Sequence, residues 1–324
     1  MSIPLLYTST PSPTLHFQEP SGPAEKCALV YLDEGGANVV FGILQDEGQA
    51  SALTGKLLRL PKALPHVQNA TAQLAAYNEH FRPLFPAHHL VQHEFIALAD
   101  GVAAHINEKL RRFTRPTSRQ NDFLAPEQDA GLLVLDMTPL KEDVNLQLKP
   151  KWLAQSPNAP PGAKRCRTCA LRASRASAGV RTATDSQSIC PLGLISDDEA
   201  VRAKAVQSTT QDDLLRNFLM HDAQALLRQL RYWQTELDKY GVLNVSNDDG
   251  ISDLCKAMTL RDCTLYVRGS DNDIEARLAD LDLKRPQKLS SWRKIEQHLI
   301  EGGWYTNTES QCSWAEETLC ILSR

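Results

Sequence analysis

The chain has 324 residues, about twice the ~150 residues of an average domain, so the sequence predicts one large domain or two closely packed ones. Hydrophobic residues make up 42% and charged residues 23% of the chain, which excludes disordered, collagen-like and coiled-coil proteins. No apolar run approaches the ~18 residues of a membrane-spanning helix, and residues 1–20 are rich in Ser, Thr and Pro, unlike a secretion signal. Eight cysteines are too few for a disulfide scaffold, so we expect a nuclear or cytoplasmic protein.

Charge is distributed unevenly along the chain. The formal net charge is −4, yet residues 149–184 contain no Asp or Glu and eight basic residues: Lys149, Lys151, Lys164, Arg165, Arg167, Arg172, Arg175 and Arg181. Such a block is either a solvated basic loop or a site where Lys and Arg bind phosphates. Trp152 is the segment's single aromatic residue, so a compact polyphosphate fits it better than nucleic acid does.

The first part of the chain predicts an antiparallel β lobe. Residues 1–25 contain five Pro and are typical of a flexible leader. The apolar segments 27–32 and 39–44 flank a glycine-containing turn at 33–38, which predicts a β-hairpin, and a third strand is expected around 56–60. Apolar residues at three- and four-residue spacing predict helices at 68–80 and 94–112.

The second part predicts mixed α and β structure. Strands are expected at 131–136, 145–149, 263–268 and 277–282, and a helix at 292–300. The clearest helix runs from Asp212 to Tyr240, where an apolar stripe from Leu215 to Leu237 indicates a core-facing side and Gly241 offers a stop. A β-rich region followed by a mixed one indicates an α+β protein.

Two features of the predicted β lobe suggest a nucleotide site. Gly35 and Gly36 at the hairpin tip would let backbone amides approach a phosphate, although most glycine turns only join strands. Arg59 on the next strand either reaches the same phosphates or lies on the surface of an edge strand. Asp136 ends an apolar strand, where kinases have the linker whose backbone binds adenine. The alternative is that Asp136 only forms a turn.

The second part contains the residue types that phosphoryl transfer requires. Proline in Lys149-Pro150-Lys151 fixes the backbone, so two ammonium groups lie along one path, or the segment is an exposed strand end. Asp262 precedes one predicted strand, and Asp280 and Asp282 lie in the last one. Transfer to a hydroxyl needs a group that takes or orients its proton, and Mg²⁺ needs oxygen ligands. Carboxylates at strand ends are also common without catalysis.

Three cysteines have part of the spacing of a zinc site: Cys166, Cys169 and Cys190. Cys255 and Cys263 are the candidates for a fourth ligand. Ordinary reduced thiols are the alternative interpretation.

Six motifs, in this order, resemble those of inositol-pentakisphosphate 2-kinases, particularly fungal ones. They lie between about residue 28 and residue 300: Glu-Gly-Gly-Ala-Asn-Val-Val at 34–40, Lys-Pro-Lys-Trp at 149–152, Lys-Arg-Cys-Arg-Thr-Cys at 164–169, Cys-Pro-Leu at 190–192, Ala-Met-Thr-Leu-Arg-Asp-Cys at 257–263 and Asp-Leu-Asp-Leu-Lys at 280–284. The resemblance implies an α+β, two-lobed inositol-phosphate kinase fold, distantly like protein kinases. The N-terminal lobe would span 26–135, after the leader, and the C-terminal lobe 136–324.

The resemblance also implies an activity. The ATP γ-phosphate would be transferred, with Mg²⁺, to the 2-hydroxyl of inositol 1,3,4,5,6-pentakisphosphate, giving inositol hexakisphosphate and ADP. The residues implied to bind the nucleotide are Gly35, Gly36, Ala37, Asn38, Arg59, Asp136 and Gln147. Gln147 stands where the family has Glu, Ala170-Leu171-Arg172 where it has Met-His-Gln, and Asp212-Asp213 where it has two Asn.

Catalytic and substrate-binding roles follow from the same resemblance. Lys149, Asp262 and Asp280 would be catalytic, with Asp280 and Asp282 holding magnesium. The substrate phosphates would be bound by Arg119, Lys151, Arg175, Arg216, Lys284 and Lys288, with Trp292 in the place of a usual Tyr.

Two other functions remain open on the sequence. One is a catalytically weak protein that only binds inositol polyphosphates, and the other is an RNA-binding factor that uses the basic segment. For the kinase we expect ATP and Mg²⁺ as cofactors, a structural zinc as a further candidate, and inositol pentakisphosphate as substrate. We expect no membrane or nucleic-acid partner and a monomer.

Overall fold

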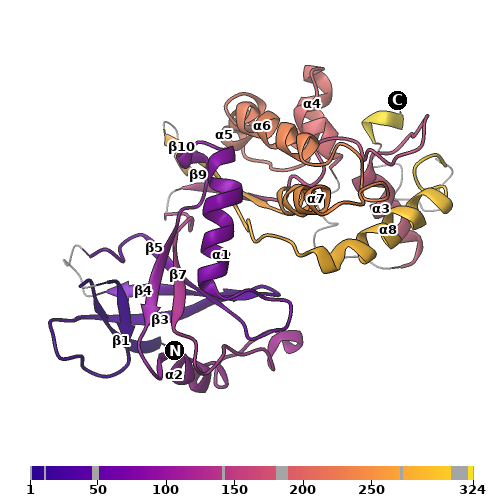
Figure 1. The fold of residues 1–324 in the computed structure, drawn as a ribbon. Helices are drawn as coiled ribbons and strands as arrows, with labels where there is room; N and C mark the ends of the chain where they lie inside the picture. The colour runs from indigo at the N-terminus through magenta and orange to yellow at the C-terminus, as the bar shows by residue number, and fades with distance from the viewer. Residues whose placement is uncertain are drawn as a thin grey trace. The chain divides into compact units, whose positions relative to one another are not determined.

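The computed structural model describes residues 2–10, 12–45, 51–140, 143–179, 189–270, 273–307 and 320–323. The chain forms two compact units (Figure 1). Unit 1 comprises Met1–Glu79 and Val91–Asp136, and unit 2 comprises His80–Leu90 and Met137–Arg324. The segment His80–Leu90, expected in the first lobe, is therefore part of unit 2.

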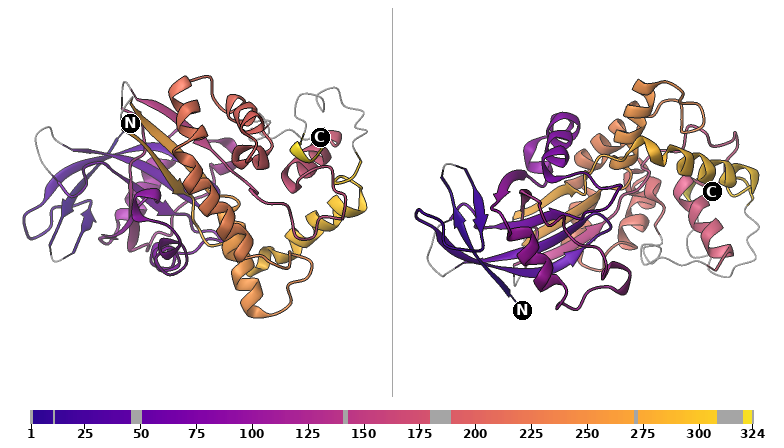
Figure 2. Two further views of the ribbon diagram at one scale, coloured as in Figure 1. Left: turned by 90° about the horizontal axis from the view of Figure 1, so that it is seen from above. Right: turned by 60° about the horizontal axis from the view of Figure 1, so that its bottom comes forward.

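Unit 1 is built on a closed barrel (Figure 2) with the strand order β1-β2-β6-β7-β5-β4-β3. All neighbouring pairs are antiparallel except β2 and β6, which are parallel, so the expected antiparallel lobe is a mixed sheet. The strands are β1 (Ser2–Thr8), β2 (Thr14–His16), β3 (Glu25–Glu34), β4 (Asn38–Gln45), β5 (Lys56–Pro61), β6 (His93–Leu98) and β7 (Ala130–Leu135).

Alternating side chains fill the barrel. Ile3, Leu29, Phe41 and Leu58 are fully buried in one cluster, as the two-residue period of strands requires. The helix α2 (Val102–Leu110) buries its apolar side in the same cluster. The predicted hairpin and the strand at 56–60 are confirmed by β3, β4 and β5.

Two predictions for unit 1 are wrong. Residues 2–8 and 14–16 form strands instead of a flexible leader, because Leu5, Tyr7 and Leu15 add buried side chains to the barrel. The segment 94–112 is not one helix. Its first part is β6, which pairs with β7, and Gly101, with φ 82°, separates it from α2. The helix predicted at 68–80 is α1 (Ala70–Ala76) followed by one π-helical turn at Tyr77–Phe81.

Unit 2 contains a three-stranded antiparallel sheet in the order β10-β9-β8. Its strands are β8 (Val144–Leu148), β9 (Thr264–Ser270) and β10 (Asp273–Ala279). The last strand begins and ends earlier than predicted, so Asp280 and Asp282 follow β10 instead of lying within it. Gly269, with φ 144°, closes the β9–β10 hairpin; a Cβ there would lie 2.0 Å from the Asp273 carbonyl oxygen.

Helices make up most of the rest of unit 2. They are α3 (Arg167–Ser177), α4 (Glu199–Gln207), α5 (Asp213–Met220), α6 (Ala223–Glu236), α7 (Asp248–Leu260) and α8 (Leu289–Glu301). Short 3-10 helices occur at Arg82–Leu84, Ala87–His89, Pro191–Ile195, Pro286–Lys288 and Ile321–Ser323, and at Thr117–Arg119 in unit 1. In the part of the chain that is described, no helix is long and apolar enough to cross a membrane.

The long helix predicted at 212–240 is two helices, α5 and α6. The chain breaks at His221, whose φ of −123° and ψ of −73° are not helical. The apolar stripe is nevertheless buried as predicted, because Leu215, Leu219 and Leu226 all face the core. Gly241 does not end the helix, which already stops at Glu236. The helix predicted at 292–300 is confirmed as α8, and the α+β class is confirmed.

Candidate active site

A pocket of about 470 Å³ opens in unit 2. Its wall comes from the end of β8, from α3, from residues 189–194, from the end of α7 and from residues 284–295. Among the described residues that line it are a single carboxylate, Asp262, and eight basic side chains: Lys149, Lys151, Arg167, Arg172, Arg175, Arg261, Lys284 and Lys288. A cavity of this composition favours a compact ligand with several negative charges.

Asp262 is the centre of a lysine cluster. Its carboxylate accepts hydrogen bonds from Lys284 Nζ at 2.7 Å and from Lys151 Nζ at 3.1 Å. The Nζ of Lys149 lies 3.9 Å from the same carboxylate and donates to the Asp262 backbone carbonyl at 3.0 Å. The tertiary structure thus brings together cations more than a hundred residues apart in the sequence.

This cluster changes the acidity of Asp262. Burial by itself raises the pKa of a carboxyl, but the attraction of Lys284, Lys151 and Lys149 outweighs it and lowers the pKa of Asp262 to about 2. The carboxylate is therefore ionised at neutral pH. It accepts hydrogen bonds readily and is a weak base.

Asp280 lies on the other side of Lys149. Its Oδ2 is 3.7 Å from Lys149 Nζ and accepts a hydrogen bond from Thr264 Oγ1. The Asp280 side chain is 51% exposed, so its oxygens are open to a cation. The backbone carbonyl of Asp282 accepts from Thr259 Oγ1 at 3.3 Å, which fixes the loop after β10.

Two of the predicted site residues have unusual backbone conformations. Lys151 has φ 58° and Asp280 has φ 57°, a region that residues other than glycine rarely adopt. Such conformations persist where the surroundings hold them, often at functional sites. The Lys151 carbonyl is held by Gln234 Nε2 at 2.8 Å, and Gln234 is fully buried.

The sequence did not predict the contacts that hold the segment 149–152. Arg261 lies over the Trp152 ring at 3.6 Å, and Arg167 lies over that ring at 4.5 Å. Arg261 Nη1 also donates to the buried carboxylate of Asp238 at 2.6 Å. Arg261 precedes Asp262 in a motif already identified, so its position in that motif was the available signal.

The remaining residues predicted to bind the inositide differ in position. Arg175, Lys288 and Trp292 line the pocket with Lys151 and Lys284. Burial, followed by repulsion from Lys284, lowers the pKa of Lys288. Gln147, which was predicted to bind the nucleotide, also lines this pocket.

Arg216 does not join the residues of the pocket. Its guanidinium donates to Asp213 Oδ1 at 2.9 Å and to the Thr210 carbonyl at 3.0 Å, elsewhere in the described part of unit 2. Asp213, one of the two acidic residues at positions where the resemblance expects Asn, forms this ion pair within α5. Arg181 lies outside the described residues.

In unit 1, Lys62 and Arg115 bind the base of the hairpin tip. Lys62 Nζ donates to the Gly35 carbonyl at 2.9 Å, and Arg115 holds the buried Glu34 through Nε at 2.7 Å and Nη2 at 2.8 Å. Burial raises the pKa of Glu34, but its hydrogen bonds to Arg115 and Lys62 lower it further than burial raises it. Gly35 and Gly36 are exposed at the tip, where the Gly35 N–H closes the turn by donating to the Asn38 carbonyl at 3.0 Å.

The other predicted nucleotide residues lie on or beside the barrel. Arg119, which was predicted to bind the substrate, is not among the residues that line the pocket; a Cβ on Gly36 would lie 3.7 Å from its guanidinium, so it lies beside the hairpin tip. Asn38 begins β4, after Ala37, whose carbonyl accepts from Lys62 N at 2.8 Å. Arg59 is buried on β5 between β4 and β7, so the surface-residue alternative is wrong. Asp136 follows β7 and donates its backbone N–H to Gly55 at 2.9 Å.

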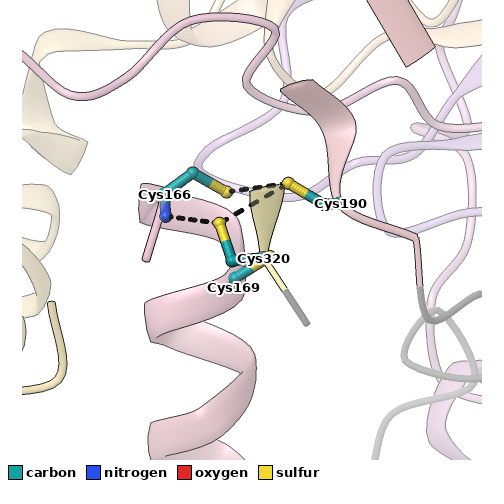
Figure 3. Close-up of side chains that lie close together, drawn as sticks. All are labelled: Cys166, Cys169, Cys190 and Cys320. Carbon is teal, nitrogen blue, oxygen red and sulfur yellow. Dashed lines mark hydrogen bonds between the residues drawn. The ribbon is translucent and has the colours of Figure 1, made fainter. Parts of the chain in front are cut away.

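Four buried cysteines converge in unit 2 (Figure 3): Cys166, Cys169, Cys190 and Cys320. Their sulfurs all lie within 4.8 Å of one another. The Cys166–Cys190 and Cys190–Cys320 sulfurs are 3.8 and 3.6 Å apart. Zn–S bonds of about 2.3 Å in tetrahedral geometry place the sulfurs roughly 3.8 Å apart, so the thiols fit zinc.

The fourth member of this set is not one of the expected cysteines. Cys255 lies on α7 in a different apolar cluster, and Cys263 is buried beside Asp262. Cys320 takes the position, and its sulfur accepts the Cys166 backbone N–H at 3.1 Å. Because Cys320 is more than a hundred residues from Cys166, spacing in the sequence gave no signal for it.

Comparison with known proteins places the chain in a family. The family model for inositol-pentakisphosphate 2-kinase matches residues 31–229 and 213–298. The inositol-pentakisphosphate 2-kinase of Yarrowia lipolytica is 33% identical over 178 residues, which cover 53% of this chain and 57% of that protein. The chain thus matches little more than half the length of this curated relative. Since the family model covers most of the chain, the protein belongs to the inositol-pentakisphosphate 2-kinase family.

Proposed function

We propose that this protein is an ATP- and Mg²⁺-dependent kinase that phosphorylates the 2-hydroxyl of inositol 1,3,4,5,6-pentakisphosphate. The products are inositol hexakisphosphate and ADP. Family membership supports the reaction class, and the relative from Yarrowia lipolytica is itself named inositol-pentakisphosphate 2-kinase. The observation that carries the proposal is the cationic pocket with the lysine-bound Asp262 at its wall.

The pocket supports a substrate with many phosphates. Eight basic side chains line it, and charge-assisted hydrogen bonds from Lys and Arg to phosphate are among the strongest that proteins make. A long nucleic acid would need stacking partners, and Trp292 lies on the pocket wall with only 8% of its surface exposed. Inositol pentakisphosphate therefore fits better than RNA.

The two carboxylates beside Lys149 have different roles in this proposal. Asp262, with a pKa of about 2, accepts a hydrogen bond from the 2-hydroxyl and orients its oxygen toward the γ-phosphorus. The new oxygen–phosphorus bond forms as the bond to ADP breaks. The hydroxyl proton passes to the Asp262 carboxylate late in the transfer, because Asp262 is a weak base, and from there to solvent. Lys149, within 3.9 Å of both carboxylates, stabilises charge on the transferring group.

In this proposal the loop after β10 binds Mg²⁺. Asp280 presents a half-exposed carboxylate and Asp282 is the second candidate ligand. These oxygens would hold Mg²⁺, which would supply neutralisation of the phosphate charge.

The nucleotide roles of unit 1 remain part of the proposal. The exposed hairpin tip at Gly35 and Gly36, with Ala37 and Asn38, would cover phosphates. Arg59 would take the part of the kinase lysine, and Asp136 would contact the adenine. We further propose that the two units are the two lobes of an inositol-phosphate kinase fold.

We also propose that Cys166, Cys169, Cys190 and Cys320 hold a structural zinc ion. The support is their burial and the tetrahedral spacing of their sulfurs. A nuclear or cytoplasmic location, where thiols stay reduced, remains our prediction.

A direct product assay tests the kinase. Purified protein, ATP, MgCl₂ and inositol 1,3,4,5,6-pentakisphosphate should give inositol hexakisphosphate and ADP in equal amounts on ion-exchange chromatography. If the pentakisphosphate raises the melting temperature but no product forms, the protein is an inositide-binding protein. If random RNA stabilises it and the pentakisphosphate does not, the kinase proposal is wrong.

A further inference from the structure

The four-cysteine centre and the cationic pocket share the same backbone segments. Arg167 and Thr168 line the pocket and stand between Cys166 and Cys169 in the sequence. On the other side of the centre, Ile189 and Pro191 line the pocket and flank Cys190. The sulfurs and this part of the wall are therefore carried by the same two backbone segments.

Apart from the contact between the Cys166 and Cys190 sulfurs, one described hydrogen bond joins these two wall segments directly: Arg172 Nη1 on α3 donates to the Ile189 carbonyl at 3.1 Å. Arg172 itself lines the pocket. A metal bridging Cys166, Cys169 and Cys190 would fix the distance between the segments much more firmly than one hydrogen bond does.

The orientation of α3 determines where its cations point. Arg167 at its first position donates through Nε to the buried Glu296 of α8 at 3.2 Å, and α3 and α8 lie side by side (Figure 1). Arg172 and Arg175 follow on the same helix. A shift of the α3 N-terminus would therefore displace three pocket arginines together.

The side chain of Cys166, at the N-cap of α3, accepts no hydrogen bond from the first turn of the helix, and the Arg167 N–H donates to Gln155 Oε1 at 3.0 Å. Instead the Cys166 N–H donates to the sulfur of Cys320 (Figure 3). Zinc with four thiolates carries a net negative charge, which a helix N-terminus stabilises. Ser323 Oγ, three residues after Cys320, donates to the Lys164 carbonyl at 2.7 Å and holds the C-terminal segment there.

We propose that the four-thiol zinc centre, completed by Cys320, positions α3 and residues 189–191 and thereby sets the affinity of the pocket for inositol polyphosphates. The inference rests on the proposed inositide function. It assigns the C-terminal segment a role in substrate binding, although Cys320 and Ser323 are not among the pocket residues.

Reversible removal of zinc tests the proposal on the full chain. Zinc is measured by mass spectrometry in the protein as purified, after chelation with a reductant present, and after reloading. We expect about one zinc ion per chain, very little after chelation, and recovery on reloading. Inositol hexakisphosphate is the probe for calorimetry, and its Kd should rise at least about tenfold without zinc and recover with it. Binding of a fluorescent ATP analogue should change less than about twofold, since the proposal confines the effect to the inositide pocket.

Two variants and hydrogen exchange complete the test. Cys320→Ala should lose zinc, and its Kd for inositol hexakisphosphate should rise as much as it does on chelation. Cys255→Ala removes a buried thiol outside the centre and should keep both the zinc and the affinity. Exchange should increase at 166–172 and 189–191 and stay unchanged in the barrel strands. Loss of protection in the barrel as well would mean general unfolding and would overturn a local positioning role.

The outcomes separate the two proposals. Absence of zinc, or equal inositide affinity with and without it, overturns the inference and leaves the kinase proposal intact. Failure of the zinc-loaded protein to bind inositol hexakisphosphate overturns both.

Discussion

Replacing Asp262 with Asn separates two effects of its carboxylate. Lys284 and Lys151 donate to it at 2.7 and 3.1 Å, and the proposed substrate phosphates need the same two ammonium groups. The carboxylate therefore competes with the inositide for its lysines. Asn keeps the size and removes the charge, so the variant should bind the inositide more tightly while transferring phosphate more slowly.

The structure sets the size of the effect. The lowering of the Asp262 pKa from 3.8 to about 2 means that the attraction of the lysines exceeds the cost of burying the charge by about 2 kcal/mol. Since 45% of the side chain is exposed, solvent screens the pairs and about 1 kcal/mol is the better value. Release of that attraction raises inositide affinity by about fivefold. Loss of the group that orients the hydroxyl should lower kcat by about a hundredfold or more.

Calorimetry with inositol hexakisphosphate, without nucleotide, measures the first effect, and the chromatographic product assay measures the second. Asp253→Asn is the matched control, because Asp253 pairs with Lys256 at 2.9 Å on α7 and is comparably exposed. It should leave both quantities unchanged. Weaker or unchanged binding by Asp262→Asn would refute the competition argument, and normal turnover would refute the catalytic role.

Four further outcomes are expected. Asp280→Asn should abolish turnover with inositide affinity within about twofold, since it removes a metal ligand and not a phosphate ligand; a parallel loss of affinity by calorimetry would contradict this. Lys151→Ala should raise the inositide Kd by about tenfold or more, and an unchanged Kd would count against a phosphate contact. The lowered pKa of Asp262 means that its contribution to folding stability is present above about pH 4 and is lost as pH falls toward about 2. On acidification, the melting temperature of Asp262→Asn should therefore fall less than that of the parent. Glu34→Gln breaks the buried pair with Arg115 and should cost about 3–5 kcal/mol in urea unfolding, whereas a cost under about 1 kcal/mol would argue that the pair is dispensable.

Local patterns predicted the elements that depend on local physics. The hairpin of β3 and β4 follows from two apolar runs and a glycine turn, and α8 follows from its helical spacing. The family motifs named the lysines and carboxylates of the candidate site in the correct order. These features are encoded within a few residues of where they act.

Other predictions failed where distant partners decide the outcome. Residues 93–98 have apolar spacing compatible with a helix, but pairing with β7 makes them a strand. Residues 2–8 look like a leader until β3 supplies their partner. The polar break at His221 interrupts an apolar stripe that runs through both α5 and α6, so periodicity did not reveal it.

By itself the sequence determined the family, the α+β class and which side chains carry the charges of the candidate site. Only the tertiary structure decided that Lys149, Lys151 and Lys284 meet on Asp262, that Arg216 is held by Asp213, and that Cys320 completes the thiol set. The physical reason is that ion pairs and metal ligands depend on distances in space. Those distances are set by the packing of helices and strands far apart in the chain, and spacing along the sequence does not contain them.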